Sequence, residues 1–292
     1  MGQIKRCAIT GANGYVGSRI VNHFSQHGWA VCELRHRQGR LLSHSGSQVS
    51  YSLELGLDPE ILIDYDVLIH CAYDFRPVRW DEILDVNVRG SERLFEAARI
   101  AGMRKIILIS TMGAFAGCMS LYGRAKLQIE EKASRMSACI IRPGLVFGKN
   151  AGGMVGALNR MVSSWRVMPL VGEENQMLHL AHEADLCALV RRCAERKDGV
   201  LKPILAASEK GKTFREMLEV LSAAHKKRLV FVRMPWRFVW VALKCSEVLG
   251  LRFGFRSDSL ISFVNKVPNP DFALIREMGV EFREFNLQTL VS

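Results

Sequence analysis

Gly11-Ala12-Asn13-Gly14-Tyr15-Val16-Gly17 separates an apolar run, Ile4 to Ile9, from a run with the pattern of a helix, Ser18 to His27. This order predicts a strand, a glycine turn and the start of a helix. In a dinucleotide-binding fold, one glycine makes the tight turn, one lets backbone N–H groups approach a pyrophosphate, and one lets the helix pack on the strand. The phosphates would then lie against the helix N-terminus. By itself the turn is weak evidence, because such turns also occur without a ligand.

Length, cysteine usage and charge limit the class of protein. A chain of 292 residues suits one enlarged α/β domain, or a large domain with a smaller one attached. Its eight cysteines include no C-x-x-C pair, which favours reduced, mostly buried thiols in a cytoplasmic protein over a disulfide framework or a metal site. We expect no signal peptide and no membrane span. The net charge of +11 favours anionic partners: nucleotide phosphates, acidic lipid or nucleic acid. Because no nucleic-acid motif is present, phosphate-bearing small molecules are the simpler account.

Val31 to Leu34 predicts the second strand, and Arg35 follows it directly. In the dinucleotide fold an acidic side chain here accepts hydrogen bonds from the ribose hydroxyls of NAD, whereas a basic one suits the 2′-phosphate of NADP. Arg35, with Arg37 and Arg40 close behind, therefore favours NADP(H), with NAD(H) as the second choice. The alternative is a solvated basic loop, because an exposed guanidinium has uses other than phosphate binding.

Two further apolar runs predict strands whose ends face the cofactor. Asp66 to Ala72 is typical of a parallel strand buried on both faces. Cys71 and Ala72 close this strand and are expected to lie over the cofactor. We interpret His70 as a packed, hydrogen-bonded side chain rather than a catalytic group. Lys105 to Ser110, rich in isoleucine, predicts the fifth strand.

Between these runs, apolar residues at helical spacing predict one helix from Asp81 to Ala101. Asn87 lies within it. Upstream, Val49 to Leu53 predicts a short third strand.

Tyr122 and Lys126 lie four positions apart at the head of another predicted helix, and therefore on one helical face. A phenol has an unperturbed pKa of about 10, and a nearby ammonium lowers that pKa by favouring the phenolate. A hydroxyl from Ser110-Thr111-Met112-Gly113, the loop after the fifth strand, can orient or stabilise the reacting oxygen. The Y-x-x-x-K pattern is common by chance, but its place after the fifth strand and behind the glycine turn makes it a strong signal.

Together these motifs resemble the extended short-chain dehydrogenase/reductase superfamily, of the NAD-dependent epimerase/dehydratase type, from Gly11 to about Leu186. The glycine spacing resembles that branch rather than the G-x-G-x-x-G of ordinary dehydrogenases. Ile141-Arg142-Pro143-Gly144-Leu145-Val146-Phe147-Gly148 is similar to the family's Arg-Pro-x-x-Val-Tyr-Gly segment. His182-Glu183-Ala184-Asp185-Leu186 is similar to its His-Val-x-Asp-Leu, and the stretch around Asn87 to its Asn-Val-x-Gly-Thr.

The resemblance implies that Tyr122 is the acid and base, that Lys126 also holds the nicotinamide ribose, and that Pro143 and Gly144 line the nicotinamide pocket. The expected cofactor-binding residues are Gly11, Asn13, Gly14, Tyr15, Val16, Gly17, Arg35, Cys71, Ala72, Asn87, Ser110, Tyr122, Lys126, Pro143 and Gly144.

The third catalytic position is open. Depending on whether a residue is inserted, it falls on Thr111 or on Met112. Methionine could not do this work. Thr111 is favoured because its distance in sequence from Tyr122 resembles the short loops of classical members of the superfamily. No acidic residue follows Thr111 where sugar dehydratases usually carry an Asp-Glu pair, which disfavours dehydration. Ala116-Gly117 stands where many relatives have Tyr-Gly, which predicts a wider active-site mouth.

The C-terminal part is less typical of the family. Leu201 to Ala206 predicts another strand, and Thr213-Phe214-Arg215-Glu216 is a capping box that opens a helix through Ala224. After a strand-like stretch, Leu229 to Val232, aromatic and basic residues mix from Met234 to Lys244. Three interpretations remain for this run: a helix that packs the small domain on the large one, a contact with the substrate, or a weak contact with an anionic membrane surface.

We therefore predict a doubly wound parallel sheet (Rossmann fold) with a smaller mixed C-terminal substrate lobe. The dinucleotide-binding domain covers residues 1–149 and the lobe mainly 150–292, with residues about 176–206 returning to the sheet. The predicted function is that of an NAD(P)-dependent oxidoreductase or epimerase acting on a nucleotide-activated sugar or a similar hydroxyl or carbonyl compound. The resemblance implies a homodimer that uses the helices bearing Asn87 and Tyr122. The alternatives are a non-catalytic nucleotide-binding sensor or assembly protein, and a reductase of a lipid-linked substrate.

Overall fold

The computed structural model describes residues 5–36, 48–172, 176–200, 202–249, 255–265, 267 and 269–291. The chain divides into two compact units. The first comprises Met1–Thr111, Ala125–Arg142 and Cys187–Ile204, and the second Met112–Arg124, Pro143–Leu186 and Leu205–Ser292.

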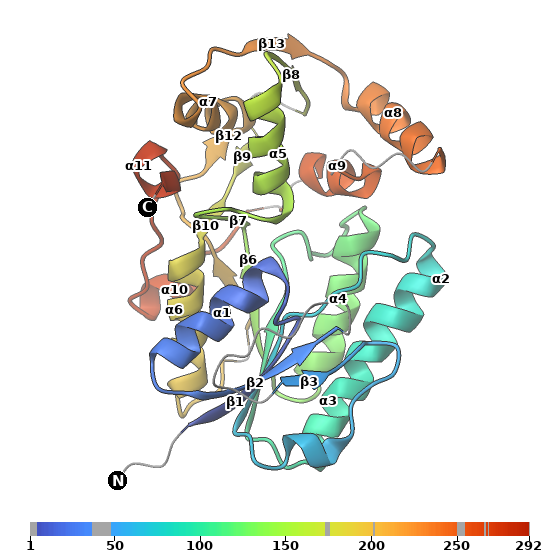
Figure 1. The fold of residues 1–292 in the computed structure, drawn as a ribbon, viewed down its shortest axis with the longest axis vertical. Helices are drawn as coiled ribbons and strands as arrows, with labels where there is room; N and C mark the ends of the chain where they lie inside the picture. The colour runs from blue at the N-terminus through green and yellow to red at the C-terminus, as the bar shows by residue number, and fades with distance from the viewer. Residues whose placement is uncertain are drawn as a thin grey trace. The chain divides into compact units, whose positions relative to one another are not determined.

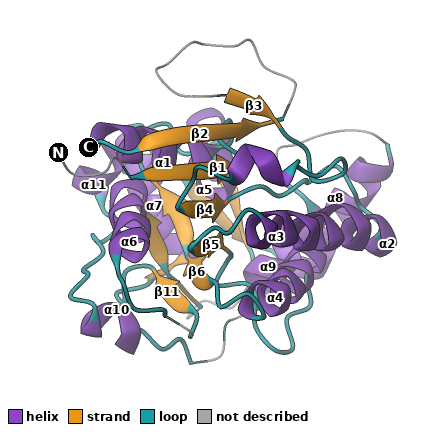
Figure 2. Cartoon of the chain, turned by 90° about the horizontal axis from the view of Figure 1, so that it is seen from below, coloured by secondary structure: helices purple, strands orange, loops and turns teal. Residues whose placement is uncertain are grey.

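Figure 1 shows the fold, and a seven-stranded sheet organises the first unit. Its strands follow the order β11-β6-β5-β4-β1-β2-β3, which can be followed in Figure 2. Its strands are β1 (Arg6–Thr10), β2 (Ala30–Arg35), β3 (Gln48–Ser50), β4 (Val67–His70), β5 (Lys105–Ile109), β6 (Cys139–Pro143) and β11 (Ile204–Ala206). Neighbouring strands from β3 to β6 pair in parallel. The strand order reverses between β1 and β4, which is where sheets of this kind bind ligands outside the carboxyl ends of their strands.

Helices cover both faces of this sheet, so its central strands are buried on both sides. Figure 2 shows α1 (Tyr15–Gln26) and α6 (Glu183–Glu195) on one face, and α3 (Gly90–Ile100) and α4 (Leu121–Ser134) on the other. α1 buries Ile20, Val21 and Phe24 at helical spacing. All four residues of β4 are buried, as its continuous apolar run predicts.

The predicted elements of this unit are present with one exception. The helix predicted from Asp81 to Ala101 is divided into α2 (Trp80–Ile83), the π-helix η2 (Leu84–Arg89) and α3. A short 3-10 helix, η1 (Pro59–Leu62), precedes β4. The apolar spacing could not show the π turn, because one residue of extra length changes the hydrogen-bonding pattern without removing the apolar face.

The second unit is a mixed lobe built from three strand pairs and several helices. β7 (Leu145–Phe147) pairs with β10 (Leu180–His182), β8 (Val167–Leu170) with β13 (Val230–Arg233), and β9 (Met177–Leu178) with β12 (Lys212–Thr213). The helices are α5 (Gly153–Ser164), α7 (Phe214–Ala224), α8 (Trp236–Val248), α9 (Ser257–Val264), α10 (Ala273–Glu277) and α11 (Leu287–Val291). The predicted doubly wound parallel sheet is therefore confirmed, and the second unit is mixed in its secondary structure.

A buried apolar cluster holds the lobe together. It includes Phe147, Val162, Met217, Leu221 and Phe285, each fully buried. The predicted capping box is present at the start of α7: the Thr213 hydroxyl accepts from the Glu216 N–H, and the Glu216 carboxylate accepts from the Thr213 N–H. Across the described ranges, no helix has the length and apolar content that crossing a bilayer requires.

The glycine turn between β1 and α1 is too tight for side chains. Gly11 has φ +66°, and the Gly14 N–H donates to the Gly11 carbonyl at 2.8 Å. A Cβ on Gly17 would lie 2.1 Å from that same carbonyl oxygen, and one on Gly11 would lie 3.0 Å from the Ala72 nitrogen. The turn therefore needs glycine at both positions, at Gly11 for its backbone conformation and at Gly17 for close packing.

Gly17→Ala is predicted to lower the free energy of unfolding by about 1–3 kcal/mol, because the methyl group must displace backbone rather than a flexible side chain. Denaturant titration measures this change. Gly199→Ala is the matched control: no atom lies within 4 Å of its added Cβ, so its unfolding curve should match the parent's. Equal stability of the two variants would contradict the close packing described here.

Candidate functional site

The N-terminus of α1 faces outward from the glycine turn and carries no side-chain cap. Gly14 is the N-cap residue, no side chain accepts a hydrogen bond there, and the first turn holds no acidic residue. Asn13 and Gly14 are exposed. The first N–H groups of a helix attract an anion. Because Gly11 and Gly17 have no Cβ, the turn is compact and its backbone can be approached closely. The turn thus fits the pyrophosphate of a dinucleotide.

A hydroxyl joins the ends of the two strands beside this turn. Thr10 Oγ1, at the end of β1, accepts from the N–H groups of Cys71 and Ala72 at 3.1 Å each. It lies 2.8 Å from His70 Nδ1. Because both acceptor sites of the hydroxyl are occupied, Thr10 donates its proton to Nδ1, and the proton of the ring is on Nε2.

His70 continues this network into the helix layer. Its Nε2 lies 2.9 Å from Ser91 Oγ, and that hydroxyl donates to the Asn87 carbonyl. His70 is fully buried, and burial, aided by the charge of Lys126, lowers its pKa to about 3. It is therefore neutral at physiological pH. Our interpretation of His70 as a packed, hydrogen-bonded side chain is confirmed.

Asn87 lies in the π-helix η2 and is fully buried. Its Oδ1 accepts from the Asp74 N–H at 2.7 Å, and its Nδ2 donates to the Asp74 carbonyl at 3.0 Å. Both groups of the amide are thus used to hold the segment that follows β4. The π turn shifts the register of the helix at Asn87. Such turns are frequent at functional sites.

Lys126, on α4, reaches the end of β5 with a buried ammonium. Its Nζ donates to the Ile109 carbonyl at 2.9 Å and lies 5.4 Å from the centroid of the Tyr73 ring. Burial lowers the pKa of this lysine to about 8. Its charge therefore titrates close to physiological pH, which is uncommon for a lysine.

Ser110 is held inward by an ion pair between the buried Glu130 and the partly buried Arg142. Its hydroxyl donates to Glu130 Oε1, and the same carboxylate accepts two hydrogen bonds from the Arg142 guanidinium, the Nε bond being 2.9 Å long. Thr111 is partly exposed and Met112 is buried. Of the two positions left open by the sequence, Thr111 is thus the one with an accessible side chain.

In the second unit, Tyr122 lies in the first turn of α4, one turn before Lys126 in the chain. Asp258, on α9, caps this turn: its two carboxylate oxygens accept from the N–H groups of Leu121 at 2.7 Å and Tyr122 at 3.0 Å. Burial raises the pKa of the Tyr122 phenol. This direction is opposite to the one expected from the Tyr-Lys spacing, because loss of hydration disfavours the phenolate.

Pro143 and Gly144 also lie in the second unit, where their backbone is closely packed. The Pro143 carbonyl accepts from the Met112 N–H at 2.9 Å, and the Gly144 N–H donates to the Ala206 carbonyl at 3.2 Å. A Cβ on Gly144 would lie 2.2 Å from the His179 carbonyl oxygen. Packing alone therefore requires glycine here.

Arg35, at the end of β2, is paired with Glu33, which is not among the residues predicted for the site. Its Nε donates to Glu33 at 2.7 Å, and its side chain is 26 % exposed. The Glu33 carboxylate is almost fully buried. Arg35 thus has a fixed guanidinium beside a carboxylate. Arg37 and Arg40 lie outside the described residues.

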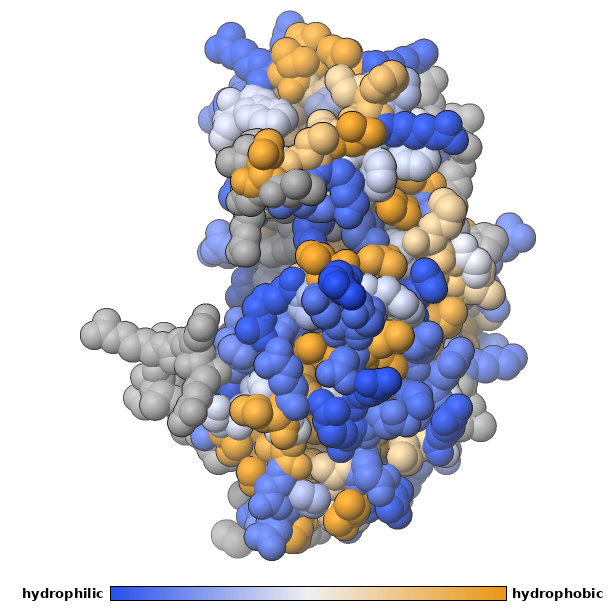
Figure 3. All heavy atoms as spheres, turned by 90° about the vertical axis from the view of Figure 1, so that its right-hand side faces the viewer, coloured by the Kyte–Doolittle hydropathy of each residue, from blue (hydrophilic) through white to orange (hydrophobic). Residues whose placement is uncertain are grey.

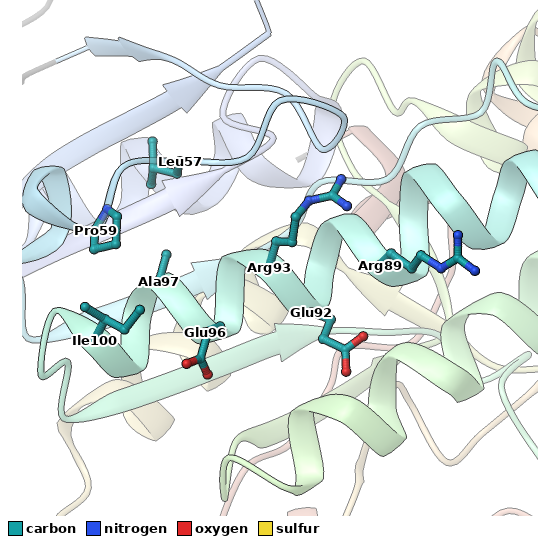
Figure 4. A pocket seen from close by; sticks show the side chains of 8 residues that line it. All are labelled: Leu57, Pro59, Arg89, Glu92, Arg93, Glu96, Ala97 and Ile100. Atoms are coloured by element: carbon teal, nitrogen blue, oxygen red, sulfur yellow. The ribbon is translucent and has the colours of Figure 1, made fainter.

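A groove of about 510 Å³ lies elsewhere in this unit, along the outer side of α3 (Figure 4). Its charged side chains bond to the protein: Arg93 donates to the carbonyls of Leu53 and Glu54, and Glu92 accepts from Lys132. Residues predicted for the site do not line it. We therefore do not assign it to the chemistry.

The first unit brings most of the predicted site residues to the carboxyl ends of neighbouring strands: Gly11 to Gly17 after β1, Arg35 at the end of β2, Cys71 and Ala72 after β4, and Ser110 and Thr111 after β5, with Asn87 and Lys126 reaching them from helices. Tyr122, Pro143 and Gly144 belong to the second unit.

Comparison with known proteins gives a family and several relatives. The NAD dependent epimerase/dehydratase family matches residues 7–205. A ceramide reductase of Caulobacter vibrioides is 28 % identical over 239 residues, covering 78 % of this chain and 73 % of that protein. A UDP-glucose 4-epimerase of Vibrio cholerae is 23 % identical over 283 residues, covering 86 % of this chain and 83 % of that protein.

Solved structures support the fold. MoeE5 in complex with UDP-glucuronic acid and NAD has a TM-score of 0.74 at 18 % identity, covering 97 % of each chain. The Bordetella bronchiseptica enzyme WbmG in complex with NAD and UDP has a TM-score of 0.74 at 17 % identity, covering 99 % of this chain and 92 % of that one. The family match spans more than half of the chain and includes the glycine turn and the Tyr-Lys pair. The predicted resemblance to extended short-chain dehydrogenases and the prediction of an enzyme are confirmed, and the chain belongs to the NAD dependent epimerase/dehydratase family.

Proposed function

We propose that this enzyme transfers hydride between a nicotinamide nucleotide and a carbinol or carbonyl carbon of a nucleotide-activated sugar or a similar compound. The observation that carries the proposal is the buried Lys126 ammonium at the end of β5, one helical turn from Tyr122. When bound, the nucleotide accepts or supplies the hydride. Its pyrophosphate would be held by the glycine turn and the first N–H groups of α1.

In this mechanism Tyr122 moves the proton of the reacting hydroxyl. During oxidation its phenolate takes the hydroxyl proton as hydride leaves the carbon, and during reduction the phenol returns it. Lys126 would favour the phenolate electrostatically and would hold the ribose of a bound nicotinamide nucleotide through a hydrogen bond. Thr111 donates a hydrogen bond to the reacting oxygen. An epimerase returns hydride to the opposite face of the keto intermediate, whereas a reductase releases its product.

The relatives support two substrate classes for this proposal. Similarity to a UDP-glucose 4-epimerase favours a nucleotide sugar, and similarity to a ceramide reductase favours a second candidate, the reduction of a carbonyl on a lipid. Dehydration remains disfavoured because no Asp-Glu pair follows Thr111. The proposed assembly is a homodimer that uses the helices bearing Asn87 and Tyr122.

For the nucleotide we propose a preference for NADP(H), with Arg35 on the 2′-phosphate. Arg35→Asp is predicted to weaken NADPH binding by about tenfold to a hundredfold, since a charge-assisted hydrogen bond is lost. NADH binding should not weaken. Titration followed by nicotinamide fluorescence measures both.

Glu33→Gln distinguishes the two uses of this pair. If Arg35 binds the phosphate, removing the competing Glu33 charge leaves NADPH binding intact or stronger. Tighter NADH than NADPH binding in the parent protein, with a loss of NADH affinity in Glu33→Gln, would contradict the preference and assign the ribose to Glu33.

Tyr122→Phe is predicted to lower kcat by about 10²–10⁴ with nucleotide affinity nearly unchanged, because a general acid–base group is removed without loss of the ring. Turnover of candidate nucleotide sugars with NADPH or NADH is the assay. Full activity of the variant would favour a non-catalytic sensor or assembly role for the nucleotide fold.

Lys126 predicts a pH dependence of nucleotide binding. Its ammonium is charged below a pKa of about 8 and neutral above it, so affinity should fall as pH rises through that value. Lys126→Met should bind more weakly and lose this dependence. Lys132→Met, on the same helix but paired with Glu92, is the control and should keep the parent's profile. A parent profile that is flat between pH 7 and about 9 would exclude this role.

A further inference from the structure

An exposed apolar stripe runs along α8, the helix that follows β13 in the second unit. Phe238, Val241 and Leu249 are 69 %, 51 % and 72 % exposed. Ala242 and Cys245, also exposed, lie between them at the same three- and four-residue spacing. In a helix this spacing places the four side chains of α8 on one face, and Leu249 follows directly after the helix ends at Val248. A surface helix normally packs such a face against the core, but this face of α8 is exposed to solvent.

The other face of α8 already contacts the protein. Trp236, Val239, Trp240 and Leu243 are half-buried and Ser246 is buried. The helix packs against α9 and is tied to it where Glu247 accepts from the N–H and hydroxyl of Ser257. The exposed stripe is therefore a second apolar face, and rotating the helix cannot hide it without exposing the first.

The strand pair that leads into α8 repeats this arrangement. β13 runs parallel to β8, with Val230 beside Val167. Val167, Val230 and Val232 are exposed, whereas Met168 is buried and Phe231 packs on the core of the lobe. The outward positions of a solvated strand pair are normally polar. Here they are valine.

Cations accompany these apolar residues almost without acids. From Lys226 to Leu249 the sequence holds six Lys or Arg residues and one acidic residue, Glu247. Arg237 and Lys244 are seven positions apart on α8 and lie along one edge of the stripe. Glu247 is engaged by Ser257 and Lys244, and Asp258, the acidic residue of α9, caps α4. Glu247 therefore offsets Lys244 in part, whereas Arg237 is exposed and lies over the Trp236 ring.

The right-hand side of Figure 1, where α8 is labelled, faces the viewer in Figure 3. Orange spheres are spread across the upper part of that view, with blue spheres beside them. Apolar and charged side chains are thus presented on one surface.

We infer that α8 and the β8–β13 pair form a docking surface for an anionic lipid bilayer. An amphipathic helix with aromatic and aliphatic residues on one face and cations beside them lies in the interface of such a membrane, with the apolar face among the acyl chains and the cations among the headgroups. A second copy of the chain fits less well, because a two-fold contact places this cationic surface against itself. The surface goes beyond the proposed reaction and does not depend on it.

The test is flotation of the full chain with vesicles of equal parts phosphatidylcholine and phosphatidylserine, against vesicles of phosphatidylcholine alone. The protein should float with the anionic vesicles and not with the neutral ones. Phe238→Ser and Arg237→Glu should each lower the partition coefficient by about tenfold, the first through lost apolar burial and the second through charge. Both side chains are exposed, so folding should not suffer.

Leu55→Ser and Arg104→Glu are the matched controls, because both residues are exposed in the first unit. They should float as the parent does. Equal unfolding midpoints and equal nucleotide affinities show that every variant is folded, and they keep this test separate from the proposed reaction. Failure of the parent to float, equal flotation with neutral vesicles, or parent-like flotation of Phe238→Ser would overturn the inference. A concentration-dependent dimer that Phe238→Ser abolishes, without vesicle binding, would assign the surface to a second copy.

Discussion

The candidate site depends on the hydrogen bonds of the Thr10 hydroxyl, which connect the carboxyl end of β1 to the segment that follows β4. The hydroxyl accepts two backbone N–H groups from the segment after β4 and donates to His70. Buried N–H groups without a partner are costly, so these bonds specify the conformation of the segment. The absence of a side chain at Gly11 then allows the turn after β1 to lie against this segment, and its absence at Gly17 allows α1 to pack on the turn itself.

Buried charges complete the site at the cost of desolvation. Lys126 loses hydration and its pKa falls, while Glu130 is held by Arg142 and accepts from Ser110. Breaking a buried pair is expensive because it leaves an uncompensated charge. These groups therefore fix helix α4 against β5 and β6. The Asp258 carboxylate stabilises the start of α4, because it accepts hydrogen bonds from helix N–H groups and its negative charge interacts favourably with the helix dipole.

The parts that were predictable from sequence are those with a local pattern. The strand, glycine turn and helix around Gly11, the buried strand at β4 and the capping box at Thr213 each need only neighbouring residues. The missed groups depend on distant ones: Asp258 caps a helix 136 positions away, and the Glu130–Arg142 pair joins a helix to a strand. The Glu33–Arg35 pair could have been predicted from the sequence, because residues two positions apart on a strand lie on the same face. The raised pKa of Tyr122 required knowledge of burial.

Hydrogen–deuterium exchange with and without NADPH tests the central claim most directly, since it needs no knowledge of the substrate. If the glycine turn and the neighbouring strand ends hold the dinucleotide, amides of residues 11–18 and 71–74 should exchange more slowly in its presence. The exchange rates of the α3 amides beside the groove should be unchanged. Protection along α3 without protection at the glycine turn would contradict this account of where the nucleotide binds.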